Sequence, residues 1–85
     1  MSDTLTLKII TPKEVFFEGS VETVTAPGTN GYFGVLKSHA SFATTLEKGK
    51  LTFRDVKGQT KAFKMDGGFL EVLKNRVLVL TDKIE

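Results

Sequence analysis

Short runs that alternate apolar and polar residues, separated by turn residues, constrain this chain more than any other feature. In the first run Leu5, Leu7 and Ile9 alternate with polar residues, which is the period-2 pattern of a strand with one face in water. Turn residues rich in Gly, Pro, Asn and Asp follow most of the runs. The pattern predicts strands at 4–9, 15–18, 21–26, 32–36, 40–46, 51–54, 59–65, 69–73 and 76–81.

This arrangement predicts an all-β fold, an antiparallel β-sandwich or small barrel of about 8–10 short strands. Only the segment 36–46 has a competing period, because its apolar residues also fit one face of a helix. Phe42 and the pair Thr44-Thr45 favour a strand there. A chain of 85 residues is long enough to bury one modest hydrophobic core. We therefore expect a single β-sandwich domain over residues 1–85.

Composition and charge exclude several classes of protein. The formal net charge is +2, too small to indicate polyanion binding by itself. The absence of cysteine excludes disulfides, thiolate zinc sites and thiol nucleophiles. The N-terminus has no signal-peptide pattern, and the longest aliphatic run, Val77 to Leu80, is far too short to span a membrane.

The stretch from Ala26 to Leu46 is the densest in possible functional residues. Its Asn30-Gly31 pair is a strong hairpin signal, because glycine adopts the positive φ that tight turns need. A loop with Lys37, Ser38 and His39 follows the next predicted strand. We expect any working surface to lie near this loop. The three glycines of the stretch do not make a phosphate-binding loop, since a strand and not a helix follows them.

Neither catalysis nor metal binding is expected. Ser38 and His39 are the hydroxyl and imidazole of a possible hydrolase site, with Asp66 or Asp82 as a third member. However, adjacent residues of an extended segment point to opposite faces, which keeps the hydroxyl away from the imidazole. One histidine without cysteine is also a poor zinc site. We predict no catalytic residue, no metal and no cofactor.

Oligonucleotide binding by a small β-barrel remains the alternative function. The segment 31–35, GYFGV, is close to the aromatic strand motif of ribonucleoprotein and cold-shock domains. Tyr32 and Phe33 are adjacent, however, so only one ring can lie on each face. Six basic residues are available for phosphate contacts: Lys48, Lys50, Arg54, Lys57, Lys61 and Lys64. A solvated sheet face is the better explanation for them.

Two longer segments, GTNGYFGVLKSHASFATTLEKGKL and GGFLEVLKNRVLVLTD, resemble the N-terminal β-sandwich of the epsilon subunit of F-type ATP synthases, called delta in mitochondria. The resemblance covers nearly the whole chain. It implies a non-catalytic central-stalk subunit that packs on the gamma subunit and on the c-subunit ring. It also implies a peripheral place on the cytoplasmic, or equivalent inner, face of an energy-coupling membrane. We expect no nucleic-acid partner, no homo-oligomer and only indirect membrane contact.

The resemblance further implies which residues meet each partner. The c-ring contact is expected at Asn30, Gly31, Tyr32, Ser38 and His39. The gamma contact is expected at Thr11, Ala40, Phe42 and Thr44. Many members of the family have an acidic residue in place of Tyr32, suited to an arginine of the c-subunit loop, so a cation–π contact is the expected substitute. The two-helix hairpin that usually follows the sandwich is absent here, and we expect no nucleotide binding.

Overall fold

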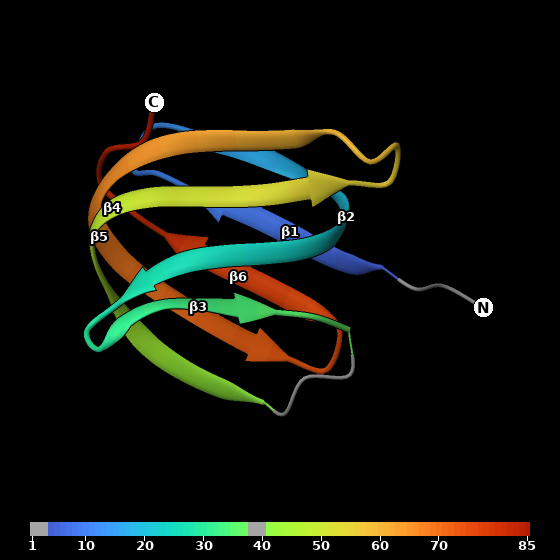
Figure 1. The fold of residues 1–85 in the computed structure, drawn as a ribbon. Helices are drawn as coiled ribbons and strands as arrows, with labels where there is room; N and C mark the ends of the chain where they lie inside the picture. Colours follow the sequence, from blue (N-terminus) through green and yellow to red (C-terminus); the bar gives the residue numbers. More distant parts are fainter. Residues whose placement is uncertain (1–3, 38–40) are drawn as a thin grey trace.

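The computed structural model, which describes residues 4–37 and 41–85, contains six β-strands and no helix in that part of the chain (Figure 1). The strands are β1 (Leu5–Ile10), β2 (Val15–Gly28), β3 (Gly31–Val35), β4 (Phe42–Asp55), β5 (Thr60–Leu73) and β6 (Arg76–Leu80). No helix long and apolar enough to cross a membrane occurs among these residues. The all-β prediction is confirmed, and the segment after residue 41 is a strand.

Three of the strands, β2, β4 and β5, are 14 residues long, so the structure has fewer and longer strands than expected. The predicted strand ends at Gly19 and Pro27 are wrong, because β2 runs through both. The predicted breaks between strands 40–46 and 51–54 and between strands 59–65 and 69–73 are also wrong, because β4 and β5 continue there in unbroken register, with Leu46 opposite Gly68 and Lys48 opposite Asp66.

Glycine bends these strands without ending them. Gly67 has φ +98, and a Cβ on Gly68 would overlap the carbonyl oxygen of Leu80 on the neighbouring strand. Both positions need glycine, because a side chain would be strained at the first and would clash at the second. Since the partner strand stays paired across the bend, the chain changes direction and remains in the sheet.

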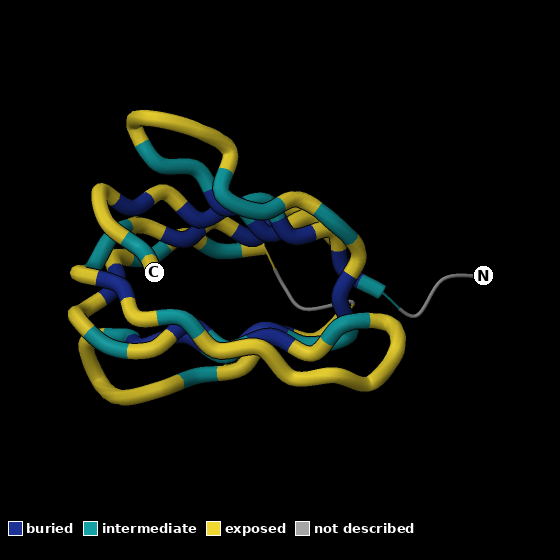
Figure 2. Tube along the Cα trace, turned by 90° about the horizontal axis from the view of Figure 1, so that it is seen from above, coloured by how far each residue is buried: buried dark blue, intermediate teal, exposed yellow. Residues whose placement is uncertain are grey.

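The bent strands build two layers (Figure 2). β1, β6, the second half of β5 and the first half of β4 pair in one layer. The second half of β4, the first half of β5, the second half of β2 and β3 pair in the other. The first half of β2 pairs with β1 and closes the sheet. One pair, β1 with β6, is parallel, whereas all other strand pairs are antiparallel.

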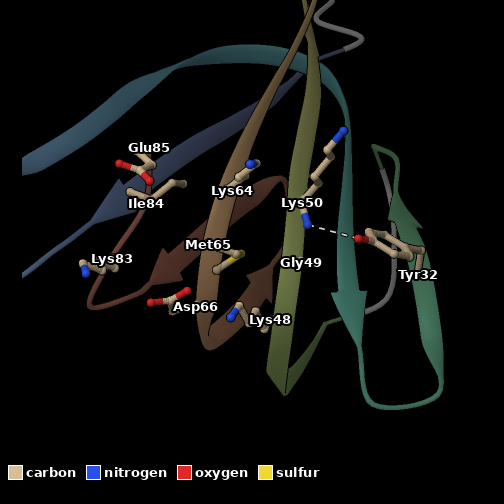
Figure 3. A pocket seen from close by; sticks show the side chains of 10 residues that line it. All are labelled: Tyr32, Lys48, Gly49, Lys50, Lys64, Met65, Asp66, Lys83, Ile84 and Glu85. Carbon is tan, nitrogen blue, oxygen red and sulfur yellow. Dashed lines mark hydrogen bonds between the residues drawn. The ribbon is translucent and has the colours of Figure 1, made fainter.

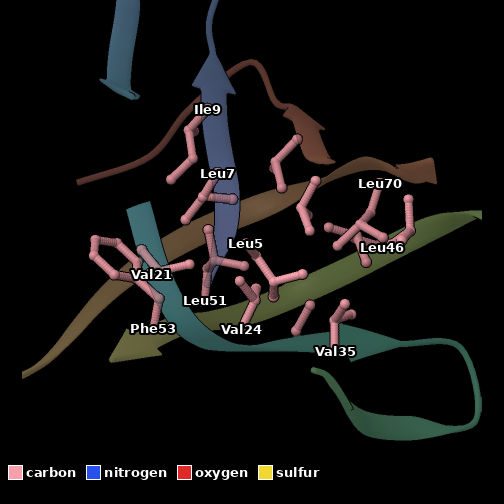
Figure 4. Close-up of a cluster of buried hydrophobic side chains, with 14 of the residues drawn as sticks. Leu5, Leu7, Ile9, Val21, Val24, Val35, Leu46, Leu51, Phe53 and Leu70 are labelled. Atoms are coloured by element: carbon pink, nitrogen blue, oxygen red, sulfur yellow. The ribbon is translucent and has the colours of Figure 1, made fainter. Parts of the chain in front are cut away.

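The core lies between the layers and uses the inward positions of every strand (Figure 4). Leu5, Leu7 and Ile9 are fully buried, as their alternation predicts. The largest buried side chain, Phe53, packs against Phe17 with ring centroids 4.5 Å apart and the two rings tilted by 37°. The other buried hydrophobic residues are Val21, Val24, Ala26, Val35, Leu46, Leu51, Met65, Leu70, Val72, Val77 and Val79. This burial is the main stabilising term of the fold.

Candidate protein-interaction site

The hairpin between β2 and β3 lies at one end of the sandwich and carries the first group of expected contact residues (Figure 1). Thr29 and Asn30 form its turn, and Gly31 ends the turn with φ +115. The chain reverses at the predicted hairpin, but the turn residues are Thr29 and Asn30, one residue earlier than the Asn30-Gly31 pair. Gly28 is required as well, because a Cβ there would lie 2.9 Å from the ring of Phe33.

Tyr32 fastens this hairpin to β4 (Figure 3). Its hydroxyl oxygen accepts a hydrogen bond of 3.0 Å from the backbone N–H of Lys50. The ladder between β2 and β4 ends at Thr25 opposite Thr52, so the N–H of Lys50 has no partner on β2. In the same register Pro27 would come opposite Lys50. The Tyr32 hydroxyl thus takes the place of a backbone ladder bond, and it does so from the neighbouring strand.

Gly49 makes room for this contact. A Cβ on Gly49 would lie 2.7 Å from the Tyr32 hydroxyl oxygen and 2.9 Å from Cβ of Pro27, both shorter than real contacts of this kind. Tyr32 and Pro27 therefore pack so closely on Gly49 that no side chain fits at position 49 without a shift. Tyr32 nevertheless remains 60% exposed, so its hydroxyl holds the hairpin to β4 while its ring stays accessible to a partner.

The same end of the sandwich holds an open hollow of about 410 Å³, lined by the hairpin and by the start of β4. Its lining residues are Gly28, Thr29, Asn30, Gly31, Tyr32, Phe33, Phe42, Ala43 and Thr44. Phe33 and Phe42 meet edge to face beside it, with ring centroids 5.8 Å apart. The structure thus brings together Asn30, Gly31 and Tyr32 with Phe42 and Thr44.

The orientation of the β4 residues differs from what a surface contact needs. Phe42 and Thr44 are half-buried and lie on the same face of β4 as the buried Leu46. The exposed residues between them are Ala43 and Thr45, which the sequence reasoning missed. Counting in twos from a buried Leu46 would have found them.

Thr11 lies apart from this group. It follows β1, which is separated from the start of β4 by β6 and β5, that is by three strand spacings or about 14 Å. Its hydroxyl accepts hydrogen bonds from the N–H groups of Lys13 and Glu14, at 3.3 and 3.2 Å. Thr11 therefore holds its own turn together. Ser38, His39 and Ala40 lie outside the described residues.

An apolar outward surface on β5 and β6 was also missed. Phe69, Leu73 and Leu80 are 39%, 57% and 41% exposed, on the side of the layer away from the core. A signal for it exists in the sequence, since a strand without alternation, such as 77–80, is typical of burial on both faces.

The structure offers little support for the oligonucleotide alternative. Tyr32 is exposed beside Lys50, whereas Phe33 is half-buried against Phe42, so the two rings give one stacking surface at most. The basic residues are also dispersed, since Lys57 lies in the loop after β4, at the opposite end of the sandwich (Figure 1).

Comparison with known proteins gives a consistent answer. Residues 4–85 match the family model of the ATP synthase delta/epsilon chain, β-sandwich domain. The ATP synthase epsilon chain of Desulfatibacillum aliphaticivorans is 42% identical over 85 residues, all of this chain and 60% of that protein. The epsilon chain of Chlorobaculum tepidum is 40% identical over 79 residues, which are 93% of this chain and 90% of that protein.

A solved structure supports the fold independently. A chain of the Euglena gracilis mitochondrial ATP synthase, in a structure of OSCP, F1 and the c-ring, superposes with a TM-score of 0.93 at 22% identity. The match covers 100% of this chain and 54% of that one. The family model matches nearly all of the sequence, and two relatives are 42% and 40% identical to it. This chain therefore belongs to the family of ATP synthase delta/epsilon chains, as their β-sandwich domain.

Proposed function

We propose that this chain is a non-catalytic central-stalk component of an F-type ATP synthase, which packs on the gamma subunit and on the c-subunit ring. The observation that carries the proposal is the family match over residues 4–85, joined to a relative that is named an epsilon chain and is similar over 90% of its own length. The Euglena structure, which is of OSCP, F1 and the c-ring, supports the choice of partners.

The geometry suits such a role. A stalk component transmits torque, and an interface that yields under load would lose coupling. Here β1 pairs on one side with β6 and on the other with β2, so the layers are tied together by backbone hydrogen bonds. The Tyr32 hydroxyl adds a further tie between the projecting hairpin and β4. Dense packing resists deformation, because interiors of this kind have low compressibility.

Two strand edges supply surfaces that a partner could cover. Among the described strands, β3 pairs only with β2, and the first half of β4 pairs only with β5. Both edges border the hollow of about 410 Å³ beside the hairpin. Unpaired edges on a soluble domain favour association with another chain, which would bury their N–H and C=O groups.

We assign the ring contact to the hairpin residues Asn30, Gly31 and Tyr32, together with Ser38 and His39, which lie outside the described residues. We assign the gamma contact to the first half of β4 and extend it to the exposed Ala43 and Thr45. Association with an energy-coupling membrane complex follows from this assembly, and the side proposed is the cytoplasmic or equivalent inner face.

Site-specific cross-linking tests the assignment, because the chain has no cysteine and each variant carries one unique thiol. Asn30→Cys and Thr45→Cys, each labelled with a photoreactive maleimide, are assembled with gamma and the c-ring. We expect Asn30→Cys to give an adduct with the c subunit and Thr45→Cys to give one with gamma.

Gln59→Cys is the matched control, because it replaces a polar loop residue at the opposite end of the sandwich. We expect it to cross-link to neither partner. Adducts of equal yield from Gln59→Cys and Asn30→Cys would contradict the assigned sites. Failure of all three variants to assemble with gamma would contradict the proposed function itself.

A further inference from the structure

A second hollow, of about 580 Å³, lies on the outer face of β4 and β5 next to Tyr32 (Figure 3). Lysines dominate its rim, and its apolar part comes from Met65 and Ile84. The full lining is Tyr32, Lys48, Gly49, Lys50, Lys64, Met65, Asp66, Lys83, Ile84 and Glu85. This basic hollow is separate from the hairpin hollow described above, although Tyr32 borders both.

On its rim two lysines stand directly opposite each other. Lys50 on β4 and Lys64 on β5 are cross-strand partners, so their side chains leave the same face of the sheet side by side. Like charges in this position destabilise a sheet. The backbones beneath them are fixed, because the N–H of Lys50 binds Tyr32 and Lys64 exchanges two hydrogen bonds of 2.8 and 2.9 Å with Glu85.

The fold does not neutralise this pair. Lys48 lies opposite Asp66, yet no ion pair within 4.0 Å joins them, and in the described part of the chain the one salt bridge found joins Arg54 to Glu22. Asp66 and Glu85 lie on the β5 side of the hollow and next to Lys83. The uncompensated charge is therefore greatest at Lys50 and Lys64, whereas Lys48 has the carboxylate residue Asp66 at the position opposite it.

We infer that this basic hollow is a docking surface for an acidic protein segment, whose carboxylates lie against Lys48, Lys50 and Lys64 while an apolar side chain covers the ring of Tyr32. Charge complementarity identifies the occupant, since each of these lysines, which have no ion-pair partner within the described residues, can bind a carboxylate of the partner. The inference goes beyond the proposed function and does not depend on it.

Other occupants fit less well. An arginine stacked on Tyr32 would add a cation to a hollow that four lysines already line, so the surroundings of this ring favour an anion over the cation that a cation–π contact requires. A nucleic-acid backbone is a continuous row of phosphates, and the carboxylates of Asp66 and Glu85 interrupt the positive charge along such a row.

The test is an amide NMR titration of the whole chain with a short blocked Glu-rich peptide that contains one leucine. We expect the largest shifts at Tyr32, Lys48, Lys50 and Lys64, with the Lys50 amide as the most sensitive reporter because it binds the Tyr32 hydroxyl. The double variant K50E/K64E should bind the peptide about ten-fold more weakly, since two attractive charge pairs become repulsive.

The double variant K57E/K61E is the matched control, because it makes the same change in net charge at the other end of the β4–β5 hairpin. We expect its peptide affinity to stay within about two-fold of the parent chain. Equal losses in both double variants would overturn the inference, because they would show an effect of net charge alone. Tighter binding of a single-stranded oligonucleotide to the same amides would overturn it as well.

The single variant K50E guards against a trivial loss of fold. It places a carboxylate opposite Lys64, so its Tm should rise by about 1–5 °C while peptide binding falls. A Lys50→Glu variant that is more stable and binds worse is the expected pair of results. A variant that is more stable and binds the Glu-rich peptide as well as the parent would overturn the inference.

Discussion

Replacing Tyr32 by Phe isolates one hydrogen bond on which the geometry of the hairpin depends. The substitution keeps the ring and removes only the hydroxyl oxygen that accepts the N–H of Lys50 at 3.0 Å. Because β2 gives Lys50 no partner, water becomes the only acceptor for that N–H. The hairpin then keeps its turn, the pairing of β2 with β3 and the pairing of β2 with β4 up to Thr25, but its tip loses the hydrogen bond to β4.

The magnitude follows from the exposure of the site. A hydrogen bond between uncharged groups contributes about 0.5–1.5 kcal/mol net, and less where water can replace the lost partner. Since Tyr32 is 60% exposed, we expect a loss of about 0.5–1 kcal/mol. For a domain of this size that corresponds to a fall in Tm of about 2–8 °C.

Urea unfolding and native-state hydrogen exchange measure the effect globally and locally. The Lys50 amide should exchange about two- to five-fold faster in Tyr32→Phe. This ratio is the loss of about 0.5–1 kcal/mol expressed as a change in the opening equilibrium. Thr60→Val is the control, because it also removes an exposed strand hydroxyl, and the Thr60 hydroxyl makes no hydrogen bond within the described residues. Its stability should stay within about 0.5 kcal/mol of the parent. An unchanged exchange rate of the Lys50 amide in Tyr32→Phe would refute the stabilising role of this hydrogen bond.

Three further substitutions test other parts of the account, each by urea unfolding. Gly49→Ala should cost about 1–3 kcal/mol because its methyl group meets the Tyr32 hydroxyl, and combining it with Tyr32→Phe should cost less than the sum; strict additivity would argue against the contact. Lys74→Gly should gain about 0.5–1 kcal/mol because φ is 58° there, and a loss would show that this backbone is not strained. Asp55→Ala should lose about 1–2 kcal/mol, since its carboxylate accepts two backbone N–H groups of the loop 56–59 at 2.9 Å; no change would mean that water replaces it fully.

The alternation of side chains predicted the strands well, because burial of one face is a local property of each run. Leu5, Leu7 and Ile9 are fully buried on one side of β1. The continuity of the strands was not predictable in the same way. Gly19, Gly49 and the pair Gly67-Gly68 look like strand ends in isolation, yet pairing with the neighbouring strand keeps them in the sheet.

The candidate site was predictable in position and not in detail. The Asn30-Gly31 signal located the hairpin, because turn chemistry is carried by adjacent residues. The bond between Tyr32 and Lys50 joins residues 18 apart, and no local pattern encodes it. The same holds for the pair of Lys50 and Lys64, which depends on the register of β4 with β5. The inward direction of Phe42 could have been counted from Leu46.

The most direct test of the central claim is a binding titration of this chain against its purified cognate gamma subunit, repeated at low and at moderate salt. A stalk component should bind saturably, one to one, with an affinity that largely survives the salt, because packing of strand edges and apolar side chains is little screened. Absence of binding to gamma at both salt concentrations would contradict the proposed role in the rotor.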